Sequence, residues 1–179
     1  MELTPQYIAG FMDGEAYFGI IRKTDYRSFL GHFYKACIKI AQVESSSFIL
    51  QLLKNRYGGN ISKTRKYKNP NQRPSIMLEI TNGIRIKKVL DEIQPFLIVK
   101  SKQADILRKF INLPKQNEVN RLEVDAMRSE LYRKILSLNK RGLAETERKD
   151  AIKGDATVRT MHINESIELS RNDSTFEEK

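Results

Sequence analysis

Residues Tyr7 to Ala16, YIAGFMDGEA, determine how this chain is expected to fold. Thr4 and Pro5 precede this stretch and are typical of a helix start. Thr caps free backbone N–H groups, and Pro fits the first helical position. We predict a helix from Pro5 to about Asp13, with apolar side chains on several of its sides. Such a helix is expected to be buried all round rather than amphipathic.

Two glycines and two acids are regularly spaced within this stretch. Gly10 and Gly14 are four residues apart, a spacing that lets two helix backbones approach closely. Asp13 and Glu15 flank Gly14, where carboxylate and carbonyl oxygens suit a hard divalent cation. Two such helices side by side would bring two acid clusters together, as two-metal phosphodiester hydrolysis requires. From the residues alone, the stronger interpretation is not a metal site. It is that the two glycines only permit packing and a helix stop, and that the two acids face solvent.

Apolar and polar residues alternate after the first helix in a pattern that predicts four strands and further helices. The predicted strands are 16–24, 33–43, 61–67 and 74–81, and the predicted helices are 45–57, 84–93, 102–113 and 118–138. In the second strand one face carries Tyr34, Ala36, Ile38 and Ile40, and the other carries Lys35, Cys37 and Lys39. The helix 45–57 is expected to turn Phe48, Ile49, Leu52 and Leu53 inward. This order indicates an α+β fold, αββαββα plus C-terminal helices, with a four-stranded antiparallel sheet backed by helices.

The charge of the chain indicates the class of its partner, and its Cys and His content excludes some kinds of site. The 179 residues contain 32 Lys and Arg against 22 Asp and Glu, and the net charge of +10 favours a partner that carries phosphate. Cys37 is the single cysteine, which excludes an intramolecular disulfide, and His32 and His162 form no zinc motif.

The chain is expected to contain one domain with an appended tail. We predict a core over 1–113, a C-terminal helical part of the same domain over 114–141, and a polar, partly disordered extension over 142–179. No run of 18 apolar residues occurs, so no membrane partner is expected. The N-terminal stretch lacks the basic region of a signal peptide, so we expect a cytoplasmic or organellar protein that is not secreted.

The segment from Ile8 to Ala16, IAGFMDGEA, resembles the LAGLIDADG motif almost position for position. The predicted strand and helix order after it is similar to that family's core, from about Thr4 to Leu138. The resemblance implies a homing endonuclease that cuts both strands of double-stranded DNA at a long pseudo-palindromic site. It further implies metal-dependent cleavage across the minor groove that leaves short 3′ overhangs.

A single copy of the motif implies a homodimer, because a duplex has two strands to cut. The resemblance places Ile8, Gly10, Phe11 and Gly14 at the two-fold interface. Two-fold symmetry of the protein in turn implies a pseudo-palindromic target.

The resemblance also assigns the metal site. Glu15 would hold Mg²⁺ or another divalent cation such as Mn²⁺, with the Gly14 carbonyl as a second ligand. Asp13 would help to end the helix. Family members often carry Asp where this chain has Glu15, and the extra methylene changes how the carboxylate reaches the cation.

Two further catalytic residues follow from the resemblance. Gln42, at the end of the second strand, would position the attacking water. Strict alternation places it on the face of Ile38 and Ile40, a conflict that a bulge or the strand end would resolve. An ordinary cap of the next helix is the alternative for Gln42. Lys100, which follows the QPFL-type turn beginning at Gln94, would lie near the scissile phosphate and stabilise developing charge.

Basic residues along the strands predict a DNA-binding face. No acidic residue occurs between Ser45 and Leu78. A basic sheet face with helices behind it can lie in the major groove, and a solvated face is the alternative. The candidate DNA contacts are Lys23, Lys35, Lys39, Lys63, Arg65, Tyr67, Arg73, Lys102, Lys140 and Arg141.

Two other functions are compatible with the motif. One is an intron RNA maturase that keeps the motif for packing, and the other is a non-catalytic DNA-binding regulator on the same fold. The presence of both Glu15 and Gln42 favours the enzyme. Regulators of this kind usually add a helix-turn-helix module, and 114–179 shows no convincing one.

Overall fold

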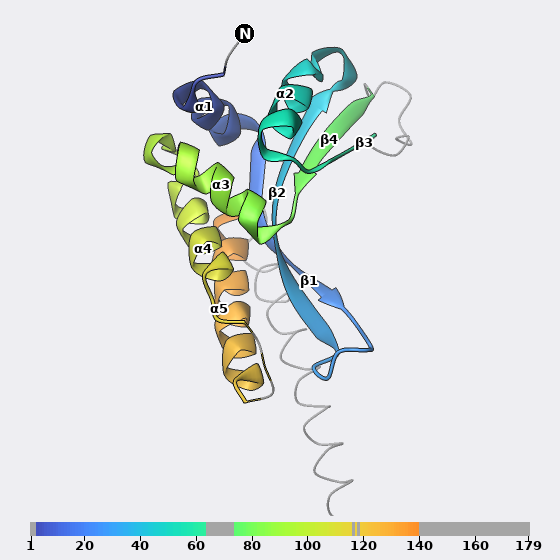
Figure 1. Ribbon diagram of the computed structural model, residues 1–179, viewed down its shortest axis with the longest axis vertical. Coiled ribbons are helices and arrows are strands. Elements are labelled where there is room, and N and C mark those ends of the chain that lie inside the picture. Colours follow the sequence, from blue (N-terminus) through green and yellow to red (C-terminus); the bar gives the residue numbers. More distant parts are fainter. Residues whose placement is uncertain (1–2, 64–73, 116, 118, 140–179) are drawn as a thin grey trace, which may run out of the picture. The chain divides into compact units, whose positions relative to one another are not determined.

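The computed structural model describes residues 3–63, 74–115, 117 and 119–139 (Figure 1). One unit spans Met1–Asn139, and the second, Lys140–Lys179, lies outside the described residues together with the predicted extension 142–179. The helices are α1 (Pro5–Glu15), α2 (Phe48–Tyr57), α3 (Gly83–Ile93), α4 (Ser101–Ile111) and α5 (Arg121–Asn139), with 3-10 turns η1 (Glu44–Ser46) and η2 (Gln94–Phe96). The strands are β1 (Ala16–Thr24), β2 (His32–Val43), β3 (Asn60–Lys63) and β4 (Ser75–Ile80).

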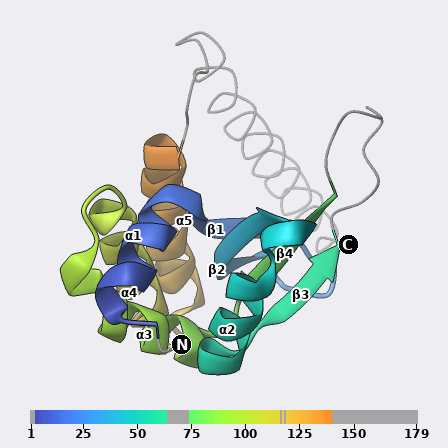
Figure 2. The same ribbon diagram turned by 90° about the horizontal axis from the view of Figure 1, so that it is seen from above.

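The four strands form one antiparallel sheet in the order β1-β2-β4-β3. Helices α1, α3 and α4 lie together on one side of it (Figure 2). The predicted α+β fold with a four-stranded antiparallel sheet is confirmed. The core between sheet and helices is made by side chains with no more than 1% exposure, among them Ile8, Met12, Phe18, Ile20, Ile38, Ile40, Leu78, Ile80 and Leu90. Burial of each such side chain stabilises the fold by roughly 1.5–3 kcal/mol.

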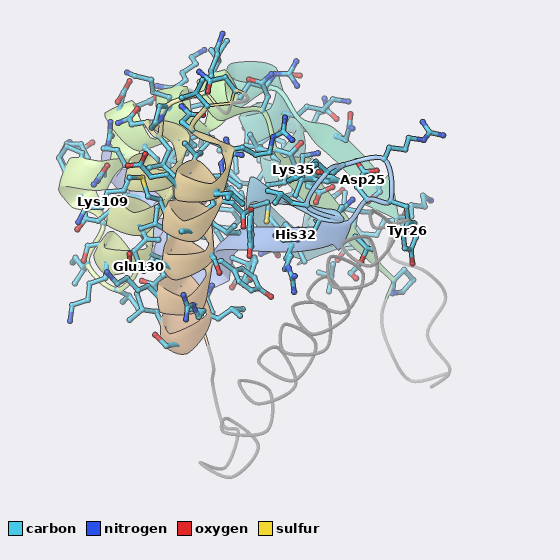
Figure 3. All side chains as sticks on the ribbon, turned by 90° about the horizontal axis from the view of Figure 1, so that it is seen from below. Asp25, Tyr26, His32, Lys35, Lys109 and Glu130 are labelled. Carbon is cyan, nitrogen blue, oxygen red and sulfur yellow. The ribbon has the colours of Figure 1, made fainter. Side chains whose placement is uncertain are left out.

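Helix α5 packs along β1, the edge strand of the sheet. The Asn139 side chain donates to the Phe18 carbonyl at 2.7 Å and so satisfies a group on the free edge. Nearer the hairpin tip, the Asp125 carboxylate of α5 lies 3.3 Å from Nε2 of His32. Figure 3 shows His32 between α5 and the hairpin tip at Asp25 and Tyr26. Helix α5 therefore fixes the β1–β2 hairpin at both ends.

The structure corrects two details of the predicted packing. The helix predicted over 45–57 is a 3-10 turn followed by α2, and Phe48 is 62% exposed rather than turned inward. Leu50 is buried instead, so the core-facing side of α2 is formed by Ile49, Leu50, Leu53 and Tyr57. Helix α1 is not buried all round, since Tyr7, Gly10 and Gly14 are exposed in the single chain.

No helix within the described ranges is long and apolar enough to cross a membrane.

Candidate active site

The end of α1 is joined to the segment before α4 by Asp13. Its carboxylate accepts hydrogen bonds from the backbone N–H groups of Ile98 at 2.7 Å, Val99 at 3.2 Å and Lys100 at 2.9 Å. Three converging N–H groups stabilise a carboxylate strongly, since hydrogen bonds to a charged acceptor are about twice as strong as neutral ones. The sequence predicted only that Asp13 helps to end α1. Its partners lie 85 to 87 residues away, so no local signal reveals the contact.

The Lys100 side chain makes a second contact with the end of α1. Its side chain is only 7% exposed, and its ammonium donates to the carbonyls of Met12, at 3.1 Å, and Asp13. The carbonyls of a last helical turn have no intrahelical donor, so a cation there is favourable. Lys100 thus places a fixed positive charge directly before Gly14 and Glu15, and its position near a scissile phosphate stays a prediction.

Glu15 ends α1 with its side chain exposed. Among the described residues, no hydrogen-bond donor or cation is paired with its carboxylate. Lys100 occupies the carbonyls of Met12 and Asp13, which leaves that of Gly14 as the next oxygen along the helix end. Within the described ranges no group of three or more His, Cys, Asp and Glu is placed to hold a metal. One chain therefore offers oxygen donors for a cation without enclosing it.

Gln42 lies near the same end of the sheet. Ala16 pairs with Ile40, so the continuation of β2 to Gln42 runs beside the end of α1. The pairing of β2 with β4 continues without a bulge through Gln42 and Val43, so Gln42 keeps the face of Ile40. Neither a bulge nor the strand end turns Gln42 to the face of the lysines, because β2 continues in register to Val43. The register thus places the end of β2 near the C-terminal end of α1, to which Lys100 is bound.

The sheet face opposite the helices carries several predicted DNA contacts. Register places Lys23, Lys35 and Lys39 on this open face, together with Tyr17 and Cys37. The Tyr17 ring lies over Gly19, where an added Cβ would come within 2.2 Å of it. Cys37, opposite Gly19, is fully buried, and burial raises the pKa of its thiol to about 11. This thiol is protonated near neutral pH.

Lys63 does not share that face, and its predicted position there is wrong. It pairs with Ile76, a core-facing residue of β4, so its side chain leaves the sheet on the helix side. There its ammonium lies 2.8 Å from the Glu44 carboxylate. Lys102 is exposed on the first turn of α4 and is not part of the strand face. The candidates Arg65, Tyr67, Arg73, Lys140 and Arg141 lie outside the described residues.

The exposed side of α1 and the segment before α4 together carry exposed apolar side chains. Tyr7 is 55% exposed, and Ile98 and Val99, held by Asp13, are 84% and 62% exposed. A Cβ added at Gly10 or Gly14 meets nothing within 4 Å in the single chain. Ile8 is fully buried in its own core, so its assignment to an interface between protomers is wrong. It lies on the opposite side of α1 from the glycines.

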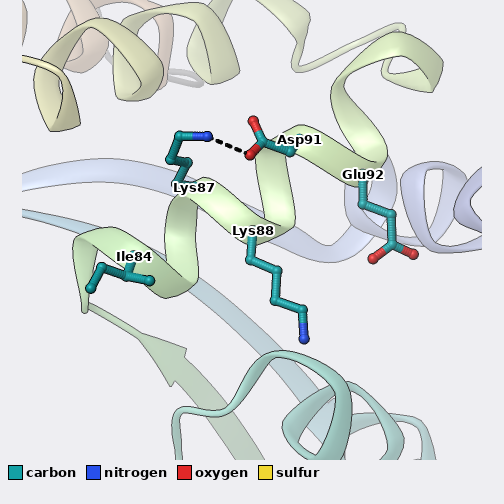
Figure 4. Close-up of a pocket in the computed structure, with 5 residues that line it drawn as sticks. All are labelled: Ile84, Lys87, Lys88, Asp91 and Glu92. Carbon is teal, nitrogen blue, oxygen red and sulfur yellow. Dashed lines mark hydrogen bonds and ion pairs between the residues drawn. The ribbon is translucent and has the colours of Figure 1, made fainter.

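A shallow hollow on α3 is lined by Ile84, Lys87, Lys88, Asp91 and Glu92 (Figure 4). Its charged groups are engaged in holding helices together. Asp91 pairs with Lys87 at 2.7 Å and Arg108 at 2.6 Å, and both cations lower the pKa of its carboxyl. Glu92 pairs with Arg56 of α2. The hollow is therefore a structural junction separate from the end of α1.

Comparison with known proteins shows the family of the chain. A model of the LAGLIDADG endonuclease family matches residues 8–113. The chain belongs to the LAGLIDADG endonuclease family. This confirms the resemblance carried by IAGFMDGEA and makes the protein an endonuclease, which cleaves phosphodiester bonds. No curated protein matches the chain.

Solved homing endonucleases share the fold of this family member. I-CvuI, crystallised with DNA, is 18% identical with a TM-score of 0.65, over 78% of this chain and 85% of its own. The archaeal intron-encoded I-Vdi141I, also in complex with DNA, is 21% identical with a TM-score of 0.63, over 79% and 87%. I-TnaI is 20% identical with a TM-score of 0.58, over 86% and 99%. At these identities the likeness establishes the fold.

Proposed function

We propose that this endonuclease is a homodimeric homing enzyme that cuts both strands of a pseudo-palindromic DNA site with the help of a divalent cation. The observation that carries the proposal is the end of α1. There the exposed Glu15 carboxylate follows two carbonyls that the Lys100 ammonium holds. A carboxylate that can hold a metal ion and a fixed ammonium at the same helix end are groups that phosphodiester hydrolysis can use.

The donor atoms of this site fit a hard cation. Mg²⁺ is usually bound by one or two carboxylates together with substrate phosphates and water, not by a closed protein cage. Glu15, with the Gly14 carbonyl beside it, provides this type of incomplete oxygen site. A cation bound there supplies an activated water and neutralises charge that develops on the phosphate. I-CvuI was crystallised with DNA in the presence of Mg or Ca, which supports the same cation class here.

Three residues of the chain, Asp13, Lys100 and Gln42, would have the other roles in cleavage. Asp13 fixes the backbone of 98–100, and this fixes the Lys100 ammonium at the helix end. That ammonium is placed to stabilise negative charge on a nearby phosphate. The Gln42 amide, at the end of β2, has both a donor and an acceptor with which to orient a water molecule.

A homodimer would place two such acid sites together. The surface formed by Tyr7, Gly10, Gly14, Ile98 and Val99 supports this arrangement, because it is apolar and exposed in the single chain. Glycines that the protomer does not need for its own packing allow a partner helix to approach closely. Phe11, half-buried beside Gly10, would line the rim of the contact.

Gly10→Leu is therefore expected to prevent dimer formation without unfolding the protomer. Overpacking of a close contact costs about 1–3 kcal/mol, and the two-fold axis doubles this cost. Analytical ultracentrifugation should show the parent chain as a dimer and the variant as a monomer. Gly83→Leu is the matched control, since Gly83 is also helical and also has nothing within 4 Å of an added Cβ. A Gly10→Leu dimer as tight as that of the parent would contradict the interface.

The open face of the sheet would bind the major groove, with Lys23, Lys35 and Lys39 near phosphates and base edges. Cleavage would cross the minor groove and leave short 3′ overhangs. Affinity should fall steeply with salt, because each phosphate contact releases counterions.

The decisive experiment is incubation of the full chain with DNA that carries the candidate intron-insertion site, with Mg²⁺ and with a chelator. Double-strand cleavage in Mg²⁺ alone is the expected result. Binding to intron RNA without DNA cleavage would identify a maturase and overturn the proposal. Specific DNA binding without cleavage in any divalent cation would identify a regulator instead.

A further inference from the structure

One row of polar side chains crosses the open face of the sheet. The register aligns Tyr17 of β1 with Lys39 of β2, Lys39 with Glu79 of β4, and Glu79 with Asn60 of β3. Paired residues in an antiparallel sheet project from the same face. The neighbouring positions on β2 and β4 are small or apolar, such as Ala41 opposite Met77. This row therefore concentrates hydrogen-bonding groups on the face proposed to bind DNA.

Glu79 is the one carboxylate that the described strands place on this face. Its carboxylate lies 3.2 Å from the Lys39 ammonium, and the two side chains are 35% and 30% exposed. An acid facing a polyanion is unfavourable unless it is paired or accepts a hydrogen bond from the ligand. Glu79 is paired, with Lys39. The pair still has a free acceptor on the Glu79 carboxylate and free donors on the Lys39 ammonium for a ligand. The Lys63–Glu44 ion pair, by contrast, lies on the helix side of the sheet and not on the open face.

The spacing of the pair matches one base pair. In the major groove a G·C pair presents the guanine O6 and N7 acceptors beside the cytosine N4 donor. O6 and N4 are hydrogen-bonded to each other, so they lie about 2.9 Å apart. The Lys39 ammonium and the Glu79 carboxylate are 3.2 Å apart. Lys donates to guanine and Glu accepts from cytosine N4, so the pair complements both bases at once.

We propose that Lys39 and Glu79 together recognise one G·C base pair in each half of the DNA target. This inference rests on the proposed function, because it needs a DNA duplex on the open face. An A·T pair places the adenine N6 donor where the ammonium would meet it and the thymine O4 acceptor where the carboxylate would, so it is disfavoured. A T·A pair presents O4 and N6 in the matching order but has a methyl group in place of the guanine N7 acceptor, so it binds the ammonium less well. Because Lys39 is on β2 and Glu79 on β4, the pair fits guanine on one DNA strand and cytosine on the other, and not the reverse. It therefore also distinguishes G·C from C·G.

The test is selection of binding sites from randomised duplex DNA by the full chain, in chelator so that binding is measured without cleavage. The parent chain should enrich a site with a G·C pair at symmetric positions of the two halves. The charge-swapped double variant K39E/E79K keeps the net charge and the ion pair. It should enrich C·G at those positions and leave the other positions unchanged.

Single variants make the test independent of the double variant's folding. Glu79→Gln should reduce discrimination at that base pair roughly tenfold. Glu130→Gln is the matched control, because Glu130 also pairs with a lysine, Lys134 at 2.5 Å, but on α5. The control should leave every position of the enriched site unchanged.

The outcomes separate this inference from the proposed function. Inversion of the base pair by the swap, or loss confined to one position in Glu79→Gln, supports the inference. Retention of the parent base pair by both variants, or an equal change at all positions, overturns it. If the parent chain enriches no site at all, the proposed function fails together with it.

Discussion

Replacement of Glu15 by glutamine should abolish DNA cleavage while DNA binding is retained. Glutamine keeps the size of the side chain but is a poor ligand for a hard cation, which prefers charged oxygen. Loss of an outer-shell partner already costs a metal site 10- to 100-fold, so loss of the ligand itself should slow cleavage by more than about 100-fold. The rate should be measured on a cognate duplex in Mg²⁺, and binding by the same protein in chelator.

The conservative variant sharpens this experiment. Glu15→Asp keeps the carboxylate and shortens it by one methylene, and it should therefore cleave far faster than Glu15→Gln. The side chain is exposed, so both variants should unfold within about 0.5 kcal/mol of the parent chain. Cleavage by Glu15→Gln at a rate close to that of the parent would show that another group holds the cation.

Replacement of Lys100 by methionine should have the second large effect, on both activity and stability. Methionine fills similar space but leaves the carbonyls of Met12 and Asp13 without the donor that now holds them. A buried acceptor left without its partner costs about 1–3 kcal/mol. Removal of one electrostatic stabiliser from an active site typically costs about 100- to 1,000-fold in rate. Denaturant unfolding and cleavage kinetics at saturating enzyme should show both losses.

Lys109→Met serves as the control for Lys100→Met. Lys109 is exposed on α4, and Figure 3 shows it among the helices away from the β1–β2 hairpin. Its replacement removes the same charge and should change the free energy of unfolding by no more than about 0.5 kcal/mol. If Lys100→Met were as active and stable as this control, the ammonium at the end of α1 would have no role in cleavage.

Much of the fold was predictable because the relevant signals are local. Alternation along β2 predicted which residues face the core, and Ser75–Ile80 alternates between half-buried and buried positions as the sequence suggested. The motif predicted the family and the position of Glu15. In each case neighbouring residues carried the signal.

Some predictions failed although a local signal was present, and other roles were missed because they depend on distant residues. Lys63 was assigned to the basic face because of its charge, although Ile61, two residues before it, faces the core side and period two places Lys63 beside it. Ile8 belongs to the motif but turns to its own core. The role of Asp13 depends on a segment 85 residues later, and that of Glu79 on its register with Lys39.

The long-range contact of Asp13 has a consequence for how activity arises during folding. It joins the first helix to residues that follow all four strands, so its formation requires closure of a long chain segment. Contacts of such sequence separation form only once the intervening structure repays the entropy of closure. Until then Lys100 is not held at the end of α1, and Glu15 has no fixed cation beside it. A partly folded chain would therefore lack the arrangement of Glu15 and Lys100 on which the proposed cleavage depends.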